Sequence, residues 1–382
     1  MQKGVTLKIG ITCYPTYGGS GIVATELGKE LAVRGHEVHF ITYAPPLRLR
    51  AGSSNIYFHE VETTSYPLFH HPPYTLALAT MMADVATAQR LDVLHCHYAI
   101  PHSVSAFLAK SMLEPLRLPV VTTLHGTDIT LVGSDRSYLP ITRFSIEKSD
   151  AVTAVSKYLR DATYRTFGVK NEIEVIYNFV NCDRCGPQRD EGMRAHFAPN
   201  GERILIHLSN FRPVKRPTDV VEIFNIVQSE LPAVLLMVGD GPERSSAEYA
   251  VLNHALGGKV HFLGKRDDIE ELTACSDLLL LPSDNESFGL AALEAMVSAV
   301  PVLVSKVGGL PEVVTDGVDG FLVEARNVEE MARRAIEILS DEDRRRRMGE
   351  RARETARTRF SSSAIIPQYE DLYERVLSAT SA

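Results

Sequence analysis

Two acidic residues, Glu286 and Glu294, stand eight positions apart in the segment ESFGLAALE. The apolar run at 288–300 predicts a helix that begins just after Glu286, so that backbone N–H groups near its start point toward any anion bound there. The first carboxylate can accept hydrogen bonds from sugar hydroxyls, and the second, about two turns further on, can hold the vicinal hydroxyls of a ribose. The pattern indicates a sugar nucleotide, but a capped amphipathic helix with two surface carboxylates has the same spacing.

Two cations, Arg212 and Lys215, follow the apolar segment RILIHLSN. Cleavage of a glycosyl phosphate bond adds negative charge to the departing diphosphate, and cations held in place stabilise that charge in the transition state. Two glycine-rich turns, GDGP at 239–242 and VGGLPE at 307–312, follow later strands and are expected beside the same crevice. The alternative for the cations is a basic surface turn.

A glycine-rich turn, YPTYGGSG, leads directly into a helical pattern in the first half of the chain. Gly18 and Gly19 would let the backbone approach a phosphate closely. The turn matches neither GxGxxG nor the Walker A motif, so a tight strand-to-helix turn that needs small residues is the alternative.

Histidines and hydroxyl residues lie at the ends of the predicted strands of the first half. His125 follows the strand PVVTT, where its imidazole or its carbonyl would lie beside an anomeric carbon with oxocarbenium character. Thr127 and Tyr98 follow strand ends as well and are candidate contacts for an acceptor. His95 and His97 lie inside the strand LHCHY and are expected to pack in a core.

Short β-branched runs alternate with helical patterns along the chain, as is typical of α/β proteins with parallel sheets. Its 382 residues exceed what one hydrophobic core usually covers, and the rhythm breaks near 180–200. We therefore expect a Rossmann-like acceptor domain at 1–182 and a Rossmann-like nucleotide-sugar domain at 183–363. A final helix at about 364–382 should pack back on the first domain, and both sheets should face a central cleft.

Composition excludes some partners. The formal net charge of −8 offers no long-range attraction for nucleic acid or an anionic membrane. The segment 341–360 carries eight arginines against five acids, but acids at helical spacing favour a solvated, ion-paired helix over a nucleic-acid arm. No signal-peptide pattern occurs, and no apolar stretch approaches ~18 residues, so a cytoplasmic protein without integral membrane association is expected.

The five cysteines are scattered and odd in number, which suits reduced thiols. Cys182 and Cys185 have CxxC spacing, but no second pair of ligands accompanies them. We therefore expect neither a metal nor another cofactor and assign this pair no role.

Six segments occur in register over both halves: the glycine-rich first turn, LHGTD, FRPVKR, VGDGP, ESFGLAALE and VGGLPEVV. Together they resemble glycosyltransferase family 4, which has the GT-B fold. The segments HCHYAIPH, ITRFSIEKSDAVTAVS, IYNFV and SNFRPVKRP narrow the resemblance to members that act in the first step of bacillithiol biosynthesis. The resemblance implies metal-independent transfer of N-acetylglucosamine from UDP-GlcNAc to the hydroxyl of L-malate, with retention of anomeric configuration.

The resemblance also implies roles for single residues. Glu294 would hold the ribose and Glu286 the sugar hydroxyls, His125 would line the sugar site, and Lys215 and Arg212 would neutralise the leaving group. Many members read GR-x-x-x-x-K here, so the match is weaker for Arg212 than for Lys215. The other implied donor contacts are Gly18, Gly19, Asn178, Arg266 (through backbone near the uracil), Ser287, Phe288, Gly289 and Leu290. The implied acceptor contacts, which offer a dianion a cation and hydroxyls, are Ser20, Tyr98, Thr123, Thr127 and Arg143.

Other functions remain open. A family 4 transferase that acts on a lipid usually has a basic, apolar membrane-facing patch on its first domain, whereas the first half of this chain shows no conspicuous basic amphipathic helix. A family 4 transferase for another acceptor, such as an inositol phosphate, is a further alternative. An isomerase such as a UDP-GlcNAc 2-epimerase would not need the acceptor cluster around Arg143, and a silent sensor would not need both Glu286 and Lys215. Arg143 also fits an ion pair with Glu147 one turn later. A homodimer is compatible with the sequence.

Overall fold

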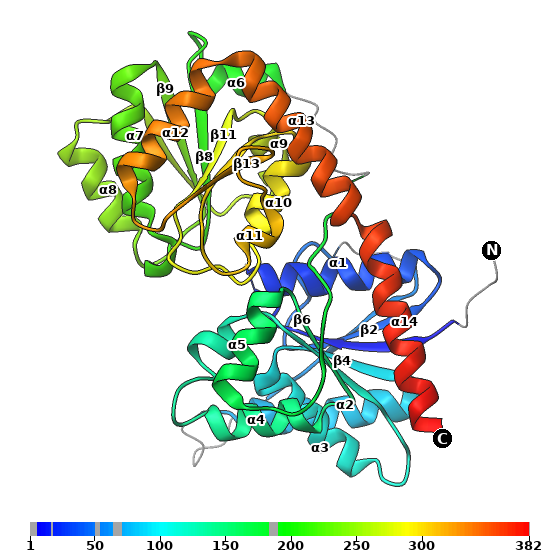
Figure 1. Ribbon diagram of the computed structural model, residues 1–382. Coiled ribbons are helices and arrows are strands. Elements are labelled where there is room, and N and C mark those ends of the chain that lie inside the picture. Colours follow the sequence, from blue (N-terminus) through cyan, green and yellow to red (C-terminus); the bar gives the residue numbers. More distant parts are fainter. Residues whose placement is uncertain (1–5, 17, 50–53, 64–70, 183–189, 382) are drawn as a thin grey trace. The chain divides into compact units, whose positions relative to one another are not determined.

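The computed structural model describes residues 6–16, 18–49, 54–63, 71–182 and 190–381. The chain divides into two compact units, one formed by Met1–Asn178 with Ile365–Ala382 and the other by Phe179–Ala364 (Figure 1). None of the described helices has the length and hydropathy needed to cross a membrane.

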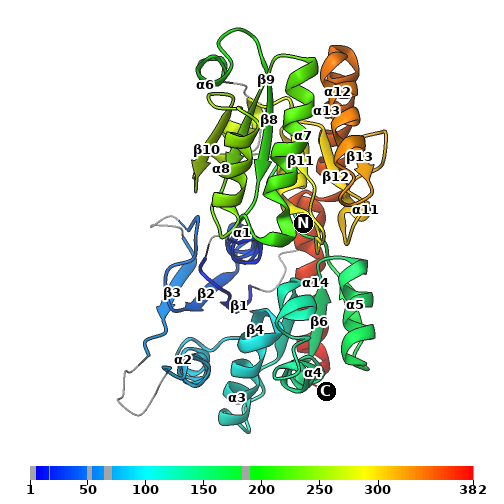
Figure 2. The ribbon, with the colours of Figure 1, turned by 90° about the vertical axis from the view of Figure 1, so that its left-hand side faces the viewer.

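The first unit is built on a parallel sheet that has seven strands within the described residues, in the order β3-β2-β1-β4-β5-β6-β7. The strands are β1 (Lys8–Thr12), β2 (Glu37–Thr42), β3 (Ile56–Glu60), β4 (Val93–His97), β5 (Val120–Leu124), β6 (Ala151–Ala154) and β7 (Ile173–Val175). The helices are α1 (Gly19–Val33), α2 (Tyr74–Gln89), α3 (Val104–Met112), α4 (Leu139–Lys148), α5 (Lys157–Phe167) and α14 (Ser362–Ser381), with short helical turns η1 (Ala99–Ser103) and η2 (Thr127–Leu131). Helices flank the sheet on both sides, so β4 and β5 are buried along their whole length (Figure 2).

The second unit repeats the scheme with six strands in its described part, all parallel, in the order β10-β9-β8-β11-β12-β13. The strands are β8 (Arg203–Leu208), β9 (Ala233–Val238), β10 (Val260–Gly264), β11 (Leu278–Leu281), β12 (Val302–Ser305) and β13 (Gly320–Val323). The helices are α6 (Glu191–Phe197), η3 (Pro213–Lys215), α7 (Pro217–Glu230), α8 (Arg244–Asn253), α9 (Ile269–Ala274), α10 (Leu290–Val297), α11 (Leu310–Val313), α12 (Val328–Ser340) and α13 (Glu342–Arg359). The expected class, α/β with two Rossmann-like sheets, is confirmed.

The strand order of each sheet reverses direction at one point, between β1 and β4 in the first unit and between β8 and β11 in the second. Loops that leave the carboxyl ends of two such strands diverge to opposite faces of the sheet. Open α/β sheets bind their ligands at this position. Functional side chains are therefore expected in the loops that follow β1, β4, β8 and β11.

From Ile365 on, the last helix, α14, is part of the first unit although it follows the second in sequence. Tyr369 and Tyr373 on this helix are fully buried, and the Tyr373 hydroxyl lies 2.7 Å from His95 Nδ1 inside the sheet. At the surface, Glu370 accepts hydrogen bonds from Arg34 at 3.0 Å and lies 3.1 Å from His36 Nε2. A buried aromatic face and a polar edge together hold α14 on this unit.

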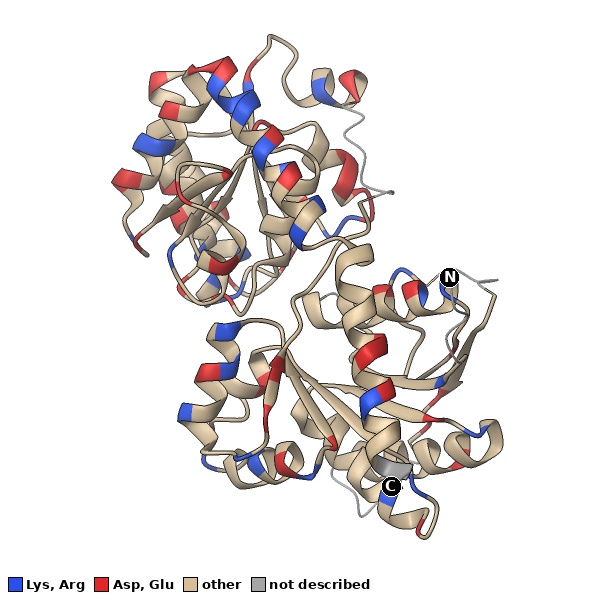
Figure 3. Ribbon diagram, turned by 45° about the vertical axis from the view of Figure 1, so that its right-hand side comes forward, with Lys and Arg blue, Asp and Glu red and all other residues tan. Residues whose placement is uncertain are grey.

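The helices α12 and α13 carry side chains of both charges (Figure 3). Arg346 pairs with Glu350 at 3.3 Å, and Arg351 pairs with Glu354 at 2.6 Å. These are the helical ion pairs that the spacing of the arginine-rich segment predicts, and such exposed pairs contribute little to stability because solvent screens them.

Acid is expected to destabilise the fold through its buried histidines. His95, His97, His102 and His207 are fully buried, and burial lowers the pKa of His95 to about 3 and those of His102 and His207 to about 4. In the unfolded chain these rings titrate near pH 6.5, so their stabilising contribution is present above that pH. It is lost as the pH falls toward 4, at about 1.4 kcal/mol per pH unit for each ring that protonates only on unfolding.

Circular dichroism at increasing urea concentration should show the unfolding midpoint falling steeply between pH 6.5 and pH 4. His207→Gln should flatten this dependence. The control variant His71→Gln, at an exposed position, should leave it unchanged. A midpoint that does not respond to pH in this range would contradict the assignment.

Candidate active site

The reversal point of the second sheet carries a cation and a carboxylate in contact. Lys215 ends η3 after β8, Glu286 follows β11, and the Lys215 ammonium donates a hydrogen bond to Glu286 Oε1. Their side chains are 20% and 12% exposed, so both are largely withdrawn from water. The two loops are also joined through the backbone, because the Asp284 N–H donates to the Val214 carbonyl at 2.8 Å. Two of the residues singled out from the sequence are thus brought together from positions 71 residues apart.

A second group of ion pairs braces the same loops. Arg216 has a left-handed backbone with φ of 51°, and it pairs with Asp219 at 2.5 Å and with Asp284 at 3.5 Å. Arg326 binds both oxygens of Asp284 at 2.9 Å, and its hydrogen bonds hold the pKa of that carboxyl below its usual value. Arg216 therefore neutralises these carboxylates, while the neighbouring Lys215 faces Glu286.

The helix after Glu286 is shorter than the sequence suggested. We expected it at 288–300, but α10 spans Leu290–Val297. Gly289 has φ of 102°, outside the helical region, and Ala299 has φ of 58°, so the chain leaves the helix at both ends. Glu294 consequently lies about one turn, and not two, inside the helix.

The loop after β12 packs tightly on the Glu286 backbone. Gly308 has φ of 57°, and a Cβ there would lie 1.8 Å from the Glu286 carbonyl oxygen. The Gly309 N–H donates to that same oxygen at 2.8 Å. Ser283 adds a hydrogen bond to the Glu286 carboxylate at 3.4 Å. The Glu286 main chain is therefore fixed by contacts that only glycine permits at position 308.

The other predicted donor residues are placed less centrally. Arg212 is exposed at the start of η3, and Arg266 follows β10 with its guanidinium bound to Asp268 at 2.5 and 2.8 Å. Phe288 is buried and packs edge-on against Phe360, so only its backbone is suited to a ligand. Ser287 and Gly289 adjoin the start of α10 beside Glu286.

In the first unit, the reversal point between β1 and β4 joins Ser20 and Tyr98. Ser20, in the first turn of α1, donates to the Tyr98 hydroxyl at 3.1 Å. Tyr98 directly follows β4 and has φ of 97°, which is strained for a residue with a side chain. Its ring contacts the rings of Tyr14 and His125, at centroid distances of 5.4 and 5.5 Å. Gly18 and Gly19 begin α1 in the same loop.

His125 follows the adjacent strand, β5, and is held by a buried carboxylate. Asp128 accepts hydrogen bonds from the N–H groups of His125 at 3.2 Å, Gly126 at 2.9 Å and Ala99 at 3.0 Å. Burial raises the pKa of Asp128 to about 6 in spite of these bonds. Burial also lowers the pKa of His125, to about 3, so its ring is neutral near pH 7. Asp128 was not among the residues singled out from the sequence, and its position just after a strand end within LHGTD was the signal for it.

Two predicted acceptor residues differ in accessibility. Thr123 is fully buried, and its hydroxyl lies 2.7 Å from both His95 Nε2 and Thr153 Oγ1. It supports the sheet interior, so we leave it out of the acceptor site proposed below. Arg143 on α4 is 46% exposed and pairs with Glu147 at 3.0 Å, which is the alternative left open by the sequence. Thr127, at the start of η2, is partly exposed.

Asn178 is buried, and its side-chain oxygen finds no hydrogen-bond partner among the residues described. Cys185 lies outside the described residues. In the described part of the chain, no group of three or more His, Cys, Asp or Glu has the geometry of a metal site.

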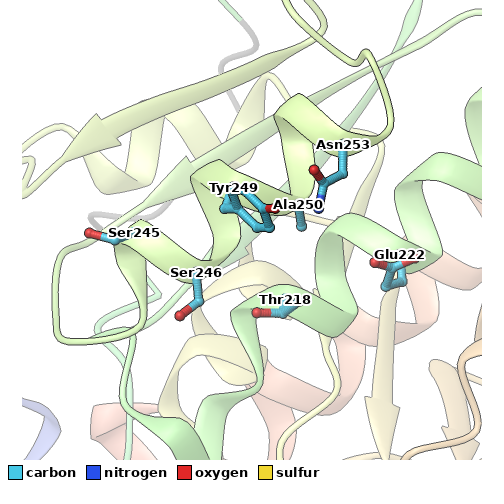
Figure 4. A pocket seen from close by; sticks show the side chains of 7 residues that line it. All are labelled: Thr218, Glu222, Ser245, Ser246, Tyr249, Ala250 and Asn253. Carbon is cyan, nitrogen blue, oxygen red and sulfur yellow. The ribbon is translucent and has the colours of Figure 1, made fainter.

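A surface hollow between α7 and α8 is separate from these loops (Figure 4). Its lining residues are Thr218, Glu222, Ser245, Ser246, Tyr249, Ala250 and Asn253. The set includes none of the residues singled out from the sequence, and we assign it no role.

Both halves of the chain match models of known families. Residues 17–184 match the model described as Glycosyltransferase Family 4, and residues 188–355 match the model described as Glycosyl transferases group 1. The N-acetyl-alpha-D-glucosaminyl L-malate synthase of Bacillus anthracis is 51% identical over 97% of each chain. The D-inositol 3-phosphate glycosyltransferase of Corynebacterium glutamicum is 26% identical over 93% of this chain and 91% of the relative.

Solved structures share the fold. HepE from Anabaena, solved in complex with UDP and glucose, has a TM-score of 0.82 at 22% identity, covering 96% of this chain and 99% of its own. Sucrose-phosphate synthase from Thermosynechococcus elongatus has a TM-score of 0.80 at 22% identity, covering 98% and 100%. With near-complete coverage by a relative of 51% identity and family matches in both halves, the chain belongs to glycosyltransferase family 4, with the GT-B fold.

Proposed function

We propose that this protein transfers N-acetylglucosamine from UDP-GlcNAc to the hydroxyl of L-malate, with retention of anomeric configuration and release of UDP. The observation that carries the proposal is the 51% identity, over 97% of the chain, to a relative named as an N-acetyl-alpha-D-glucosaminyl L-malate synthase. The product is the one expected for the first step of bacillithiol biosynthesis.

The donor is assigned to the loops around Lys215 and Glu286. The bond between the anomeric carbon and the phosphate oxygen breaks, and the added charge on the diphosphate is stabilised by the Lys215 ammonium. Backbone N–H groups at the start of α10, with Gly18 and Gly19, provide further donors for phosphate oxygens. Glu286 accepts hydrogen bonds from sugar hydroxyls, and Glu294 accepts those of the ribose.

The acceptor is assigned to the first unit. Malate brings two carboxylates, for which Arg143 provides a cation and Ser20, Tyr98 and Thr127 provide hydroxyl groups. A new bond forms between the malate oxygen and the anomeric carbon on the face that UDP leaves. The hydroxyl proton passes to the departing phosphate oxygen, so that the enzyme needs no nucleophile of its own.

A substrate screen tests the proposal. UDP release should depend on L-malate and should be weak with D-malate or an inositol phosphate, and NMR should show an α-linked product. Turnover with inositol phosphate in place of malate would favour the family 4 alternative. Formation of UDP-ManNAc from UDP-GlcNAc alone would favour an isomerase.

Arg143→Ala is expected to raise the KM for L-malate by about tenfold or more while changing the KM for UDP-GlcNAc little, because a charge-assisted contact to the acceptor is lost. Steady-state kinetics with each substrate varied in turn measures the two constants. Glu147→Gln is the matched control, since it removes the partner seen in the free protein and leaves the cation in place. Equal changes in both KM values would place Arg143 outside the acceptor site.

The remaining assignments belong to the same proposal. We place the enzyme in the cytoplasm and expect activity without added metal, and both a monomer and a homodimer are compatible with the proposal. Assay after chelation tests the activity without metal, and light scattering of the purified protein distinguishes the monomer from the homodimer.

A further inference from the structure

His97 lies between two other histidine rings, those of His95 and His125. It ends β4 and is fully buried. One face of the ring packs on His95, with ring centroids 4.5 Å apart and planes 28° apart. His125 lies at the edge of the His97 ring, with centroids 5.1 Å apart and planes 26° apart. Its Nδ1 lies 2.8 Å from His125 Nε2, within hydrogen-bond distance.

The direction of this hydrogen bond follows from the other nitrogen of His97. Nε2 is buried and has no hydrogen-bond partner in the described part of the chain. A buried N–H without an acceptor is costlier and rarer than an unused lone pair. The ring is neutral, because burial holds the pKa of His97 well below its usual value. Its one proton is therefore on Nδ1, and His97 donates to His125 Nε2.

The proton of His125 is fixed as a consequence. Since Nε2 of His125 accepts, a neutral ring must hold its own proton on Nδ1. The main chain of His125 is already held by Asp128, so the remaining freedom is rotation of the ring, which the contact with His97 restricts. His95 prevents His97 from moving away, because its own ring is held by Tyr373 and Thr123 at 2.7 Å each.

We propose that His97 is a positioning residue that sets the tautomer and orientation of His125, so that His125 acts as a hydrogen-bond donor to an oxygen of the bound sugar nucleotide. In this state neither nitrogen of His125 can take the proton of the malate hydroxyl. Nδ1 already carries a proton, and Nε2 accepts the hydrogen bond from His97. His125 is then not the base, and the departing phosphate is left to accept the proton. The catalytic role given to His125 rests on the proposed transfer reaction, whereas the contacts between His97 and His125 are those of the protein without substrate.

A double-mutant cycle tests the coupling between the two histidines. His97→Leu is expected to lower kcat about tenfold, with the KM for UDP-GlcNAc within about twofold of wild type, because orientation and not binding is lost. His97→Asn, whose amide nitrogen can occupy the place of Nδ1, should restore most of this loss. In a His125→Ala background, His97→Leu should have no further effect on kcat. Additive losses, or an asparagine variant no better than leucine, would overturn the inference.

Two readouts separate this inference from the proposed reaction. Nitrogen NMR of histidine-labelled protein, with His125→Gln for assignment, should show protonated Nδ1 and unprotonated Nε2 for His125 in the free wild-type protein. A protonated Nε2 of His125 would contradict the role proposed for His97, even if malate is the acceptor. An Nδ1–H signal without malate-dependent turnover would instead overturn the reaction alone.

A matched variant controls for the loss of any buried histidine. His39 is buried in the same sheet, where it contacts Glu37 and His59, and it has no contact with His125. His39→Leu should lower the melting temperature about as much as His97→Leu but leave kcat near wild type. If both variants lower kcat equally, the role of His97 is structural.

Discussion

Lys215→Ala is expected to lower kcat by about a hundredfold or more, on the order of 3 kcal/mol of transition-state stabilisation. The ammonium lies at the reversal point of the second sheet, is 20% exposed, and is held by Glu286. In a site largely withdrawn from water, a fixed cation stabilises developing phosphate charge far more than it would in solvent. The loss should appear mainly in kcat, because the extra charge forms only as the bond to UDP breaks.

Steady-state kinetics of UDP release measures this effect. Lys259→Ala is the control, since Lys259 is an exposed lysine of the same unit that contacts Gln228. Lys215→Arg should retain more activity than alanine because it keeps the charge, and less than wild type because the geometry of the cation differs. A nearly normal kcat for Lys215→Ala would remove this residue from the catalytic site.

Glu286→Gln is expected to reduce kcat by a similar factor, about a hundredfold. The substitution keeps the size and shape of the side chain but removes the charge, so the hydrogen bonds to the sugar weaken and Lys215 loses its partner. The packing of Gly308 and Gly309 on the Glu286 backbone should keep the loop in place. The melting temperature is therefore expected to change little, which separates a catalytic loss from an unfolded loop.

Glu222→Gln is the matched control for this second substitution, because Glu222 is a surface carboxylate of the same unit that contacts His254 at 2.9 Å. Calorimetric titration with UDP gives an independent readout. UDP carries no transferred sugar, so its affinity for Glu286→Gln should remain near that of wild type. A large loss of UDP affinity would assign Glu286 to the nucleotide and not to the sugar.

The fold class and the loops that carry the chemistry follow from the amino-acid sequence alone. Alternating β-branched and helical segments are a local property, and parallel strands buried on both faces leave a continuous apolar pattern that needs no tertiary information to be recognised. The functional segments LHGTD, FRPVKR and ESFGLAALE each follow such a strand. Their side chains are therefore placed at the carboxyl ends of strands by sequence order.

Which of these side chains meet depends on the packing of distant segments. Contact between Lys215 and Glu286 requires β8 and β11 to be neighbours in the sheet. The local sequence around either residue does not determine this strand order. The start of α10 at Leu290 depends on the left-handed backbone of Gly289. The apolar pattern does not reveal this conformation and predicts an earlier start. The ring of His95, which packs on that of His97, is held by Tyr373 of α14, a residue 278 positions away in the sequence. Local pattern fixes elements and strand ends, whereas contacts between distant segments follow from strand order, register and the closure of long loops.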